Sequence, residues 1–234
     1  MKNIISNNSF SIVIPAFNEF SNLEKLCKEI YESLINYNYE IIIINDCSTD
    51  NTLEILESLS KKYNKIKYFS NKFNSGQSYS ISKGIKNSSF DIIVTIDADL
   101  QNNPNDIKKL LSIYINEGFK LVGGIRLKRN DSYLKIISSI IANKVRSKIL
   151  NDNCVDTGCG LKVFDKKIFL DFPFFSGIHR FLPALYSGYG YKTYFVNVDH
   201  RKRFAGKSKY GVLNRLFKGI KDMFLVLKII KEKK

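Results

Sequence analysis

Two carboxylates and an amide stand at alternate positions in the segment VTIDADLQNNP, directly after an apolar run. They belong to Asp97, Asp99 and Gln101. Their oxygen atoms are the ligands that hard divalent cations such as Mg²⁺ and Mn²⁺ prefer in proteins. A cation held by few protein groups completes its shell with phosphate oxygens, so a nucleoside diphosphate is the ligand expected beside it. The same spacing is also found in solvated acidic turns before helices, and spacing alone does not separate the two interpretations.

Five apolar runs suit the buried strands of a parallel sheet, and helical patterns separate them. The runs are residues 10–14, 40–44, 66–69, 91–96 and 120–124. This alternation predicts βαβ units, and therefore an α/β fold with a mostly parallel central sheet and helices on both faces. Ligands of such sheets bind beyond the carboxyl ends of the strands. We therefore expect segments 15–19, 45–50 and 97–101 to meet on one rim.

Three apolar stripes at helical period lie between these strands. They consist of Leu23, Leu26, Ile30 and Leu34; of Leu53, Leu56 and Leu59; and of Ile107, Leu110, Leu111 and Tyr114. Ser21 and Glu24 have the spacing of a capping box at the first stripe. Asp50 and Asn51 are candidate caps for the second, and Pro104 precedes the third.

The second half of the chain is less regular. It predicts a helix over 133–150, a glycine-bearing turn at 156–160, strands over 161–164 and 191–198, and a helix from Val212 onward. In this last helix one face is expected to carry Leu213, Leu216, Phe217, Ile220, Met223, Phe224, Leu227 and Ile230, with Arg215, Lys218, Lys221 and Lys228 largely opposite. We treat residues 1–211 as one catalytic domain and 212–234 as a basic amphipathic helix, a candidate for binding a membrane surface.

The chain is strongly basic, with 37 Lys and Arg against 22 Asp and Glu and a formal net charge of +15. The part from Arg201 onward carries +10 of that charge. Such an excess indicates an anionic partner such as a nucleotide, a phospholipid or another phosphate. Nucleic acid is disfavoured, because the sequence has no RNP-type stretch and no Cys/His finger. The absence of GxGxxG and GxxxxGK[ST] argues against dinucleotide oxidoreductases and P-loop enzymes.

The four cysteines form no C-x-x-C pair and have no histidine at ligand spacing. We therefore expect reduced thiols, with neither a zinc site nor a disulfide framework. No apolar run of about 18 residues occurs and the N-terminus does not resemble a signal peptide, so no transmembrane helix is expected. The predicted location is cytoplasmic, peripheral on the inner face of the membrane.

Seven motifs occur in the order seen in family 2 glycosyltransferases. They are IPAFNE (14–19), NDCSTD (45–50), NSGQSYSISKGI (74–85), DADLQNNP (97–104), DTGCGLKVF (156–164), HRFLP (179–183) and GKSKYG (206–211). The sequence resembles the subgroup that charges a polyisoprenyl phosphate, which includes dolichol-phosphate mannose synthase and bacterial undecaprenyl-phosphate glycosyltransferases. The resemblance implies a GT-A fold, an inverting hexosyltransferase, Mg²⁺ or Mn²⁺, a UDP- or GDP-linked sugar donor and an undecaprenyl or dolichyl phosphate acceptor. Direct transfer to a cell-surface glycan is the alternative, and a homo-oligomer is compatible with both.

The resemblance also implies roles for residues at matching positions. Nucleotide contacts fall on Pro15, Phe17, Glu19, Asp46, Gln77, Asp97 and Ala98. Asp46 would accept a hydrogen bond from the base, while Asp97, Asp99 and Gln101 would hold the metal on the diphosphate. The catalytic assignments are Asp99, Asp156 and Arg126.

On the acceptor side, Arg126, Lys135 and Ser139 match the phosphate-binding positions of the mannose synthases, although an arginine is usual where Lys135 stands. Lys135 and Arg129 are equally compatible with a solvated helix face. Asp156 would orient the acceptor or act as a base, or simply form a turn before Gly158. The remaining acceptor or phosphate candidates are His179, Arg180, Arg201, Arg203, Lys207, Ser208 and Lys209, the last five of which are also compatible with a generic basic loop.

Sugar transfer of this kind requires stabilisation of the leaving diphosphate and positioning of the acceptor phosphate. A departing nucleoside diphosphate gathers negative charge that a divalent cation stabilises. A lipid phosphate, with a second pKa of about 6, is already largely ionised at neutral pH and needs positioning more than deprotonation.

The sequence departs from the family pattern in three places. Asn45 and Cys47 replace the usual Asp and Gly, and Asn102 or Asn103 replaces the usual His. The two transmembrane helices common at the C-terminus of bacterial relatives are not found. The helix over 212–231 is our proposed substitute, since apolar burial and attraction to anionic lipids bind such a helix to an interface. Packing of this helix on the catalytic domain is the alternative.

Overall fold

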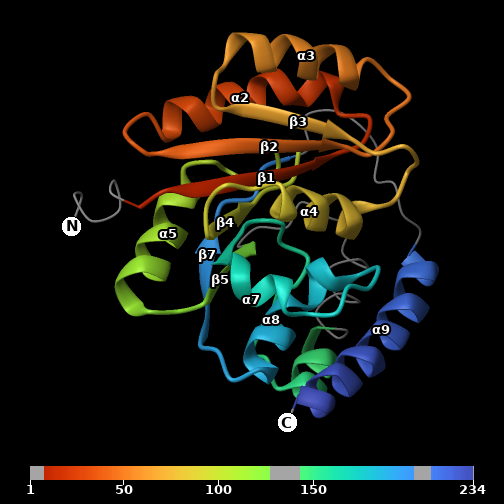
Figure 1. Cartoon of the computed structure of the whole chain (residues 1–234). Coiled ribbons are helices and arrows are strands. Elements are labelled where there is room, and N and C mark those ends of the chain that lie inside the picture. Colours follow the sequence, from red (N-terminus) through yellow and green to blue (C-terminus); the bar gives the residue numbers. More distant parts are fainter. Residues whose placement is uncertain (1–7, 127–142, 203–211, 234) are drawn as a thin grey trace.

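A seven-stranded sheet organises the protein (Figure 1). The computed structural model describes residues 8–126, 143–202 and 212–233, and only the backbone over 212–218. The strands are β1 (Phe10–Ala16), β2 (Tyr39–Asn45), β3 (Ile66–Ser70), β4 (Ile92–Thr95), β5 (Leu121–Arg126), β6 (Lys162–Asp165) and β7 (Thr193–Val198). The helices are α2 (Phe20–Ser33), α3 (Thr52–Lys62), α4 (Gln77–Lys86), α5 (Asp106–Glu117), α7 (Lys166–Leu170), α8 (Ile178–Gly188) and α9 (Val212–Lys233), and residues 143–150 are also helical.

The strand order is β3-β2-β1-β4-β6-β5-β7. Every neighbouring pair is parallel except the two that involve β6, which runs antiparallel to β4 and β5. The carboxyl ends of the other six strands therefore share one rim with the start of β6. The turn at 156–160, which precedes β6, lies at the same rim as segments 15–19, 45–50 and 97–101.

Helices cover both faces of the sheet, so the strands read as continuous apolar runs. Along β1, Ile12 and Ile14 pack in a core cluster with α2, α3 and α5, whereas Val13 between them packs with α4, α8 and α9. Gly84 of α4 lets this helix approach β1 closely, because a Cβ there would overlap the side chain of Val13. The mostly parallel sheet with two helical layers is therefore confirmed.

All seven predicted strands are confirmed within a few residues, as is the turn at 156–160. Two details at helix starts are wrong. α2 begins at Phe20 without a side-chain cap, so the capping box of Ser21 and Glu24 does not form. Leu53, expected in the core, is 41% exposed because it lies in the first turn of α3. Of the helix expected over 133–150, residues 133–142 lie outside the described part.

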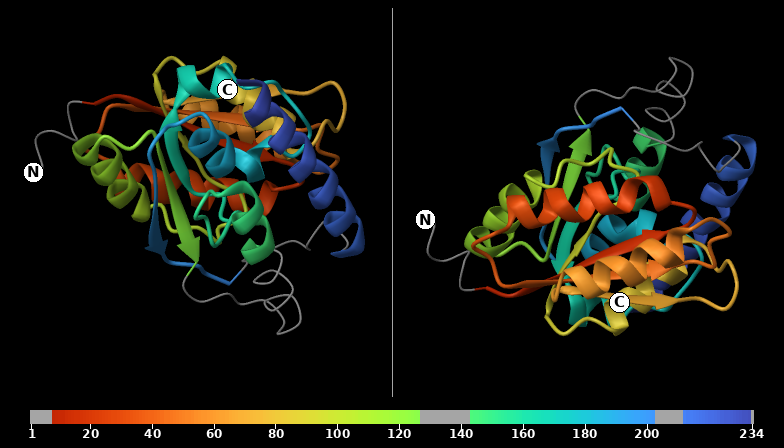
Figure 2. Two further views of the ribbon diagram at one scale, coloured as in Figure 1. Left: turned by 90° about the horizontal axis from the view of Figure 1, so that it is seen from below. Right: turned by 90° about the horizontal axis from the view of Figure 1, so that it is seen from above.

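α9 lies on the periphery of the molecule (Figure 2), and its C-terminal half packs against α8. The buried face consists of Asp222, Met223, Val226, Ile229 and Ile230. Ile220 and Phe224, expected on that face, are 45% and 61% exposed, a correction to the predicted stripe. Gly188 sets this orientation, since a Cβ there would overlap Ile230. No helix within the described ranges is both long enough and apolar enough to cross a membrane.

Candidate active site

The loops after β1 and β2 hold each other at the rim. Asn18 has a positive φ of 54°, and its N–H donates to Ser48 Oγ at 2.9 Å. Its side-chain oxygen accepts the N–H of Thr49 at 2.8 Å, and the N–H of Glu19 donates to Thr52 Oγ1 at 2.9 Å. The partly exposed nucleotide candidates Phe17 and Glu19 therefore lie on a pair of loops joined by hydrogen bonds, and Pro15 lies just before them near the end of β1.

Asp46 is buried and organises the segment that leads into α4. Its Oδ1 accepts hydrogen bonds from Asn71 Nδ2 at 2.7 Å and from the N–H of Ser75 at 2.9 Å, and its Oδ2 accepts from the N–H of Gly76 at 2.8 Å. A carboxylate offers about four acceptor positions, so these bonds leave capacity for a further donor. The sequence missed this organising role, and contact with a nucleotide base stays a prediction.

Asp97 is packed between α4 and the turn before β6. Gln77 Nε2 donates to its Oδ1 at 2.9 Å, which brings two nucleotide candidates together. A Cβ on Gly160 would come within 2.6 Å of all three carboxylate atoms of Asp97, so only glycine allows this approach. Thr95 Oγ1 fixes the same turn by donating to the carbonyl of Gly160 at 2.8 Å.

Ala98 is buried in the core cluster, so its side chain does not reach a ligand. A nucleotide contact at this position would have to use the backbone. The residue that follows, Asp99, points back toward its own loop, because its Oδ1 accepts the N–H of Gln101 at 3.2 Å. Between these two residues Leu100 has a positive φ of 62°, which allows the tight turn.

The donor set of Asp97, Asp99 and Gln101 fits a hard divalent cation, because all three offer oxygen on one short turn. Gln101 Nε2 donates to the carbonyl of Arg201 at 3.4 Å, which orients the amide. Over the described ranges, no group of three or more His, Cys, Asp or Glu side chains gathers as a self-sufficient metal site. A cation here would therefore take part of its shell from a ligand such as a diphosphate.

Arg126 and Asp156 form a largely buried bidentate pair beside Asp97. Arg126 Nε donates to Asp156 Oδ2 and Nη2 donates to Oδ1, both at 2.7 Å, and the N–H of Arg126 adds a third bond at 3.2 Å. The two side chains are 13% and 6% exposed. Burial alone would lower the pKa of Arg126, but the bonds and charge of Asp156, with the charge of Asp97, raise it above its ordinary value. The sequence placed both residues on the acceptor side, and the structure brings them together.

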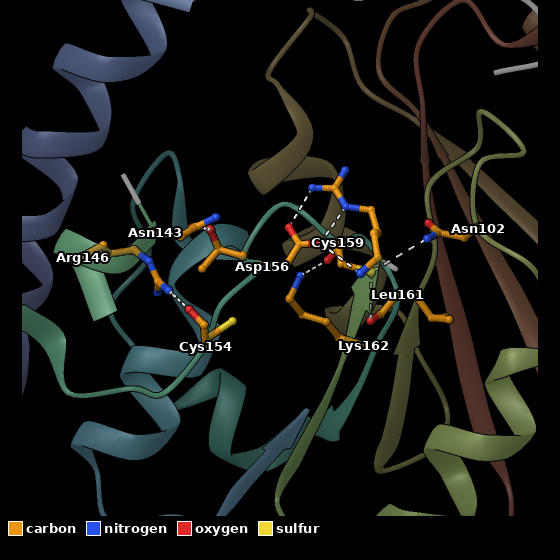
Figure 3. A network of polar contacts seen from close by, with 10 residues as sticks. Asn102, Asn143, Arg146, Cys154, Asp156, Cys159, Leu161 and Lys162 are labelled. Carbon is orange, nitrogen blue, oxygen red and sulfur yellow. Dashed lines mark hydrogen bonds and ion pairs between the residues drawn. The ribbon is translucent and has the colours of Figure 1, made fainter. Parts of the chain in front are cut away.

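A buried network supports the turn that carries Asp156 (Figure 3). Arg146, 8% exposed, donates to the carboxylate of Asp152 and to the carbonyl of Cys154. Lys162, the first residue of β6, donates to the carbonyl of Cys159. Sequence reasoning missed Arg146 and Lys162, because a charged residue in a helix or strand pattern reads as solvent-facing unless its buried partner is known.

Three further basic or polar candidates are each engaged by another element. His179 Nδ1 lies 2.6 Å from Ser78 Oγ of α4. Arg180 donates to Asp222 of α9 at 3.0 Å. Arg201 donates to Glu29 of α2 at 2.6 Å, which directs this guanidinium toward α2. Outside the described residues lie Arg129, Lys135, Ser139, Arg203, Lys207, Ser208 and Lys209, whose roles stay predictions.

The segment after β7 is fastened to the loop that carries the metal candidates. Asn102 forms an antiparallel bridge with His200, and the N–H of Arg201 donates to the carbonyl of Gln101 at 2.9 Å. Asn103 Nδ2 donates to Asp199 at 3.2 Å. Asn102 and Asn103, one of which replaces the usual histidine, thus both take part in the contact between these segments.

Residues 11–172 match the family model described as Glycosyl transferase family 2. The chain is 32% identical over 208 residues to the undecaprenyl-phosphate 4-deoxy-4-formamido-L-arabinose transferase of Shewanella sediminis, with 87% of this chain and 62% of the relative covered. It is 30% identical over 207 residues to the protein of the same name from Aeromonas hydrophila, covering 87% and 63%. The chain therefore spans less than two thirds of the length of these relatives.

Among solved structures, the chain is similar to glucosyl-3-phosphoglycerate synthase from Mycobacterium tuberculosis in complex with Mn²⁺, UDP and phosphoglyceric acid. The TM-score is 0.72 at 18% identity, covering 96% of this chain and 79% of that one. The same enzyme with Mg²⁺ and UDP gives a TM-score of 0.71. This likeness shows the GT-A fold that the motifs predict.

Proposed function

The chain belongs to glycosyl transferase family 2, and on that premise we propose that it moves a sugar from a nucleotide-sugar donor to a polyprenyl phosphate. The observation that carries the proposal is the buried, bidentate pair of Arg126 and Asp156 next to Asp97. In this arrangement the oriented guanidinium of Arg126, proposed to bind the acceptor phosphate, lies beside the carboxylate of Asp97, proposed to hold the donor diphosphate through a metal ion. The names of the relatives, undecaprenyl-phosphate sugar transferases, support the same acceptor class.

The donor nucleotide would lie over the rim of β1, β2 and β4. Asp46 holds the segment from Asn71 to Gly76 in place, so the nucleoside site is formed before the ligand arrives. Asp97, Asp99 and Gln101 would hold Mg²⁺ or Mn²⁺, which supplies Lewis-acid stabilisation of the charge on the departing diphosphate.

The acceptor phosphate would bind at Arg126. Asp156 engages two of the five N–H groups of the guanidinium through its side chain, which leaves others to bind phosphate oxygens. An aspartate that accepts both arms of an arginine is better suited to orienting it than to removing a proton. The lipid phosphate is already ionised, so this geometry favours the orienting role of Asp156 over the role of base.

In the transfer, an oxygen of the lipid phosphate forms a bond to the anomeric carbon of the sugar. The bond from that carbon to the diphosphate oxygen breaks, and the nucleoside diphosphate leaves with the electron pair. Attack opposite to the leaving group inverts the anomeric configuration. The chain's own contribution is to align the two phosphates and to limit their motion.

A peripheral position at the membrane would bring the enzyme to its lipid. The outward face of α9 combines the apolar side chains of Ile220, Phe224 and Leu225 with Lys221 and Lys228, all exposed. Such a mixed face suits the interface of an anionic bilayer. The inward face packs on α8, so the two alternatives for this helix are compatible with each other.

The proposal is tested by incubating the protein with radiolabelled UDP- and GDP-sugars, Mn²⁺ and undecaprenyl phosphate. Label should pass into an organic-extractable product that mild acid hydrolyses. Label that enters only polar glycan would support direct glycan extension instead. A prior thermal-shift screen of the same donors would identify the nucleotide, because a ligand that binds the folded state raises the melting temperature.

A further inference from the structure

The residue before α8 forms a hydrogen bond with a serine that has no role in the proposed mechanism. Ser78, in the first turn of α4, is 5% exposed. The N–H of Gly177, the residue before α8, donates to Ser78 Oγ at 2.8 Å. On its other side this oxygen lies 2.6 Å from His179 Nδ1.

The direction of the second bond follows from counting hydrogens. A serine hydroxyl has one hydrogen to donate and two lone pairs to accept. The backbone N–H of Gly177 can only donate, so it occupies a lone pair of Ser78. Within the described part of the chain, His179 is the remaining recorded partner of this hydroxyl. If Nδ1 carried the imidazole hydrogen, the buried hydroxyl hydrogen would have no acceptor, which costs free energy.

We propose that Ser78 is a positioning residue, which donates to Nδ1 of His179 and so keeps the imidazole hydrogen on Nε2. The ring is then a neutral hydrogen-bond donor with a fixed orientation. A hydrogen on Nε2 is suited to donation to an oxygen of an anionic substrate, such as a sugar hydroxyl or a phosphate. This inference rests on the proposed function for the identity of that substrate.

The position of the pair supports this role. Ser78 directly follows Gln77, whose side chain donates to Asp97 at 2.9 Å. His179 is therefore linked, through two adjacent residues of α4, to the carboxylate of Asp97 after β4. From the other side, Asp222 lies against Gly177 and accepts a bond from Arg180, so the first turn of α8 is fixed between α4 and α9.

The tautomer can be read directly by ¹⁵N-edited NMR of histidine-labelled protein, because the chain has only two histidines. A His200→Gln variant assigns the signals. The wild type should show His179 with an unprotonated Nδ1 and a protonated Nε2. Ser78→Ala should give a mixture of tautomers and lower kcat by about 10- to 100-fold with a smaller change in donor KM. Ser78→Thr, which keeps the hydroxyl, should restore both.

A wild-type spectrum with the hydrogen on Nδ1 would overturn the proposal, and this result needs no variant to fold. So would a folded Ser78→Ala protein that keeps both the single tautomer and the wild-type kcat. The spectrum requires no substrate, so the two proposals can fail separately. A correct tautomer in a protein that transfers no sugar to lipid phosphate would contradict the proposed function and leave the hydrogen bond established.

Discussion

At the scale of single residues, the site is built from charged groups whose partners are already in place. Asp46, Asp97 and Asp156 are each held by donors from a different segment of the chain. The sequence predicted these aspartates from their motifs, because motif spacing reports which residue types the chemistry needs. It could not predict that Asn71 donates to Asp46 or that Gln77 donates to Asp97, since those contacts depend on how distant segments meet.

The pair of Arg126 and Asp156 gives a prediction at this scale. Asp156→Ala leaves a buried guanidinium without its counter-charge, which should lower the free energy of unfolding by about 3–5 kcal/mol. Urea denaturation measures the loss. Glu32→Ala, which removes a pair with Lys28 whose side chains are 65% and 68% exposed, is the control and should cost under about 1 kcal/mol. Equal losses in the two variants would show that the pair at the site is not buried as described.

At the scale of elements, strand and helix positions followed from apolar periodicity, because a sheet covered on both faces needs continuous apolar strands. The antiparallel direction of β6 did not follow, since a four-residue strand pattern does not indicate in which direction the strand runs through the sheet. The single apolar stripe predicted for α9 was partly wrong for a related reason, because Ile220 and Phe224 are exposed while Met223 and Ile230 are buried. Its sequence offers apolar side chains on more than one face, and the close contact of Ile230 with Gly188 selects which face is buried.

The close contact between Asp97, after β4, and Gly160, in the turn before β6, predicts how one added methyl group would change the catalytic rate. Gly160→Ala should displace the carboxylate of Asp97, and a shift of about 1 Å in such a group lowers kcat by about 100-fold. Steady-state kinetics over a range of Mn²⁺ concentrations measures this. Gly219→Ala is the matched control, because a Cβ at that position in α9 meets no atom of the described residues within 4 Å. Wild-type kinetics in Gly160→Ala would argue against any role of Asp97 in holding the metal.

The exposed face of α9 predicts binding to lipid. Phe224→Asp removes an apolar group and adds a negative charge at a side chain that is 61% exposed, so affinity for vesicles containing anionic lipid should fall about tenfold or more. Vesicle co-sedimentation measures it. Ile35→Asp, at a side chain that is 77% exposed after α2, should bind as the wild type does. Equal loss in both variants would point to non-specific adsorption.

At the scale of the whole molecule, the fold and the position of the rim were predictable from sequence. The contacts that join the segment after β7 to the loop of the metal candidates were not. Asn102 and His200 are about a hundred residues apart in sequence, and no local pattern links them. All four cysteines are free, as expected from their spacing.

Thiol reactivity tests the integrity of the core. Burial raises the pKa of Cys27 from 9.0 to about 12, and burial likewise raises that of Cys154 to about 11. The folded state holds these two thiol protons more tightly than the unfolded state does. The free energy of unfolding should therefore be constant with respect to these thiols below a pH of about 9, and should fall as the pH rises from there toward the folded pKa values. At a pH of about 8, alkylation followed by mass spectrometry should modify the partly exposed Cys47 first and the buried thiols only after unfolding. Modification of Cys27 as fast as Cys47 would show that the core opens readily.

The central claim is that the lipid phosphate itself becomes glycosylated. ³¹P NMR of undecaprenyl phosphate, protein, Mg²⁺ and the donor identified by thermal shift reports this directly. A monoester signal that moves with pH, because its second pKa is about 6, should be replaced by a diester signal that does not move, together with free nucleoside diphosphate. Chelation of the metal, or Asp99→Asn, should stop the conversion. Release of nucleoside diphosphate while the lipid monoester persists would contradict the account.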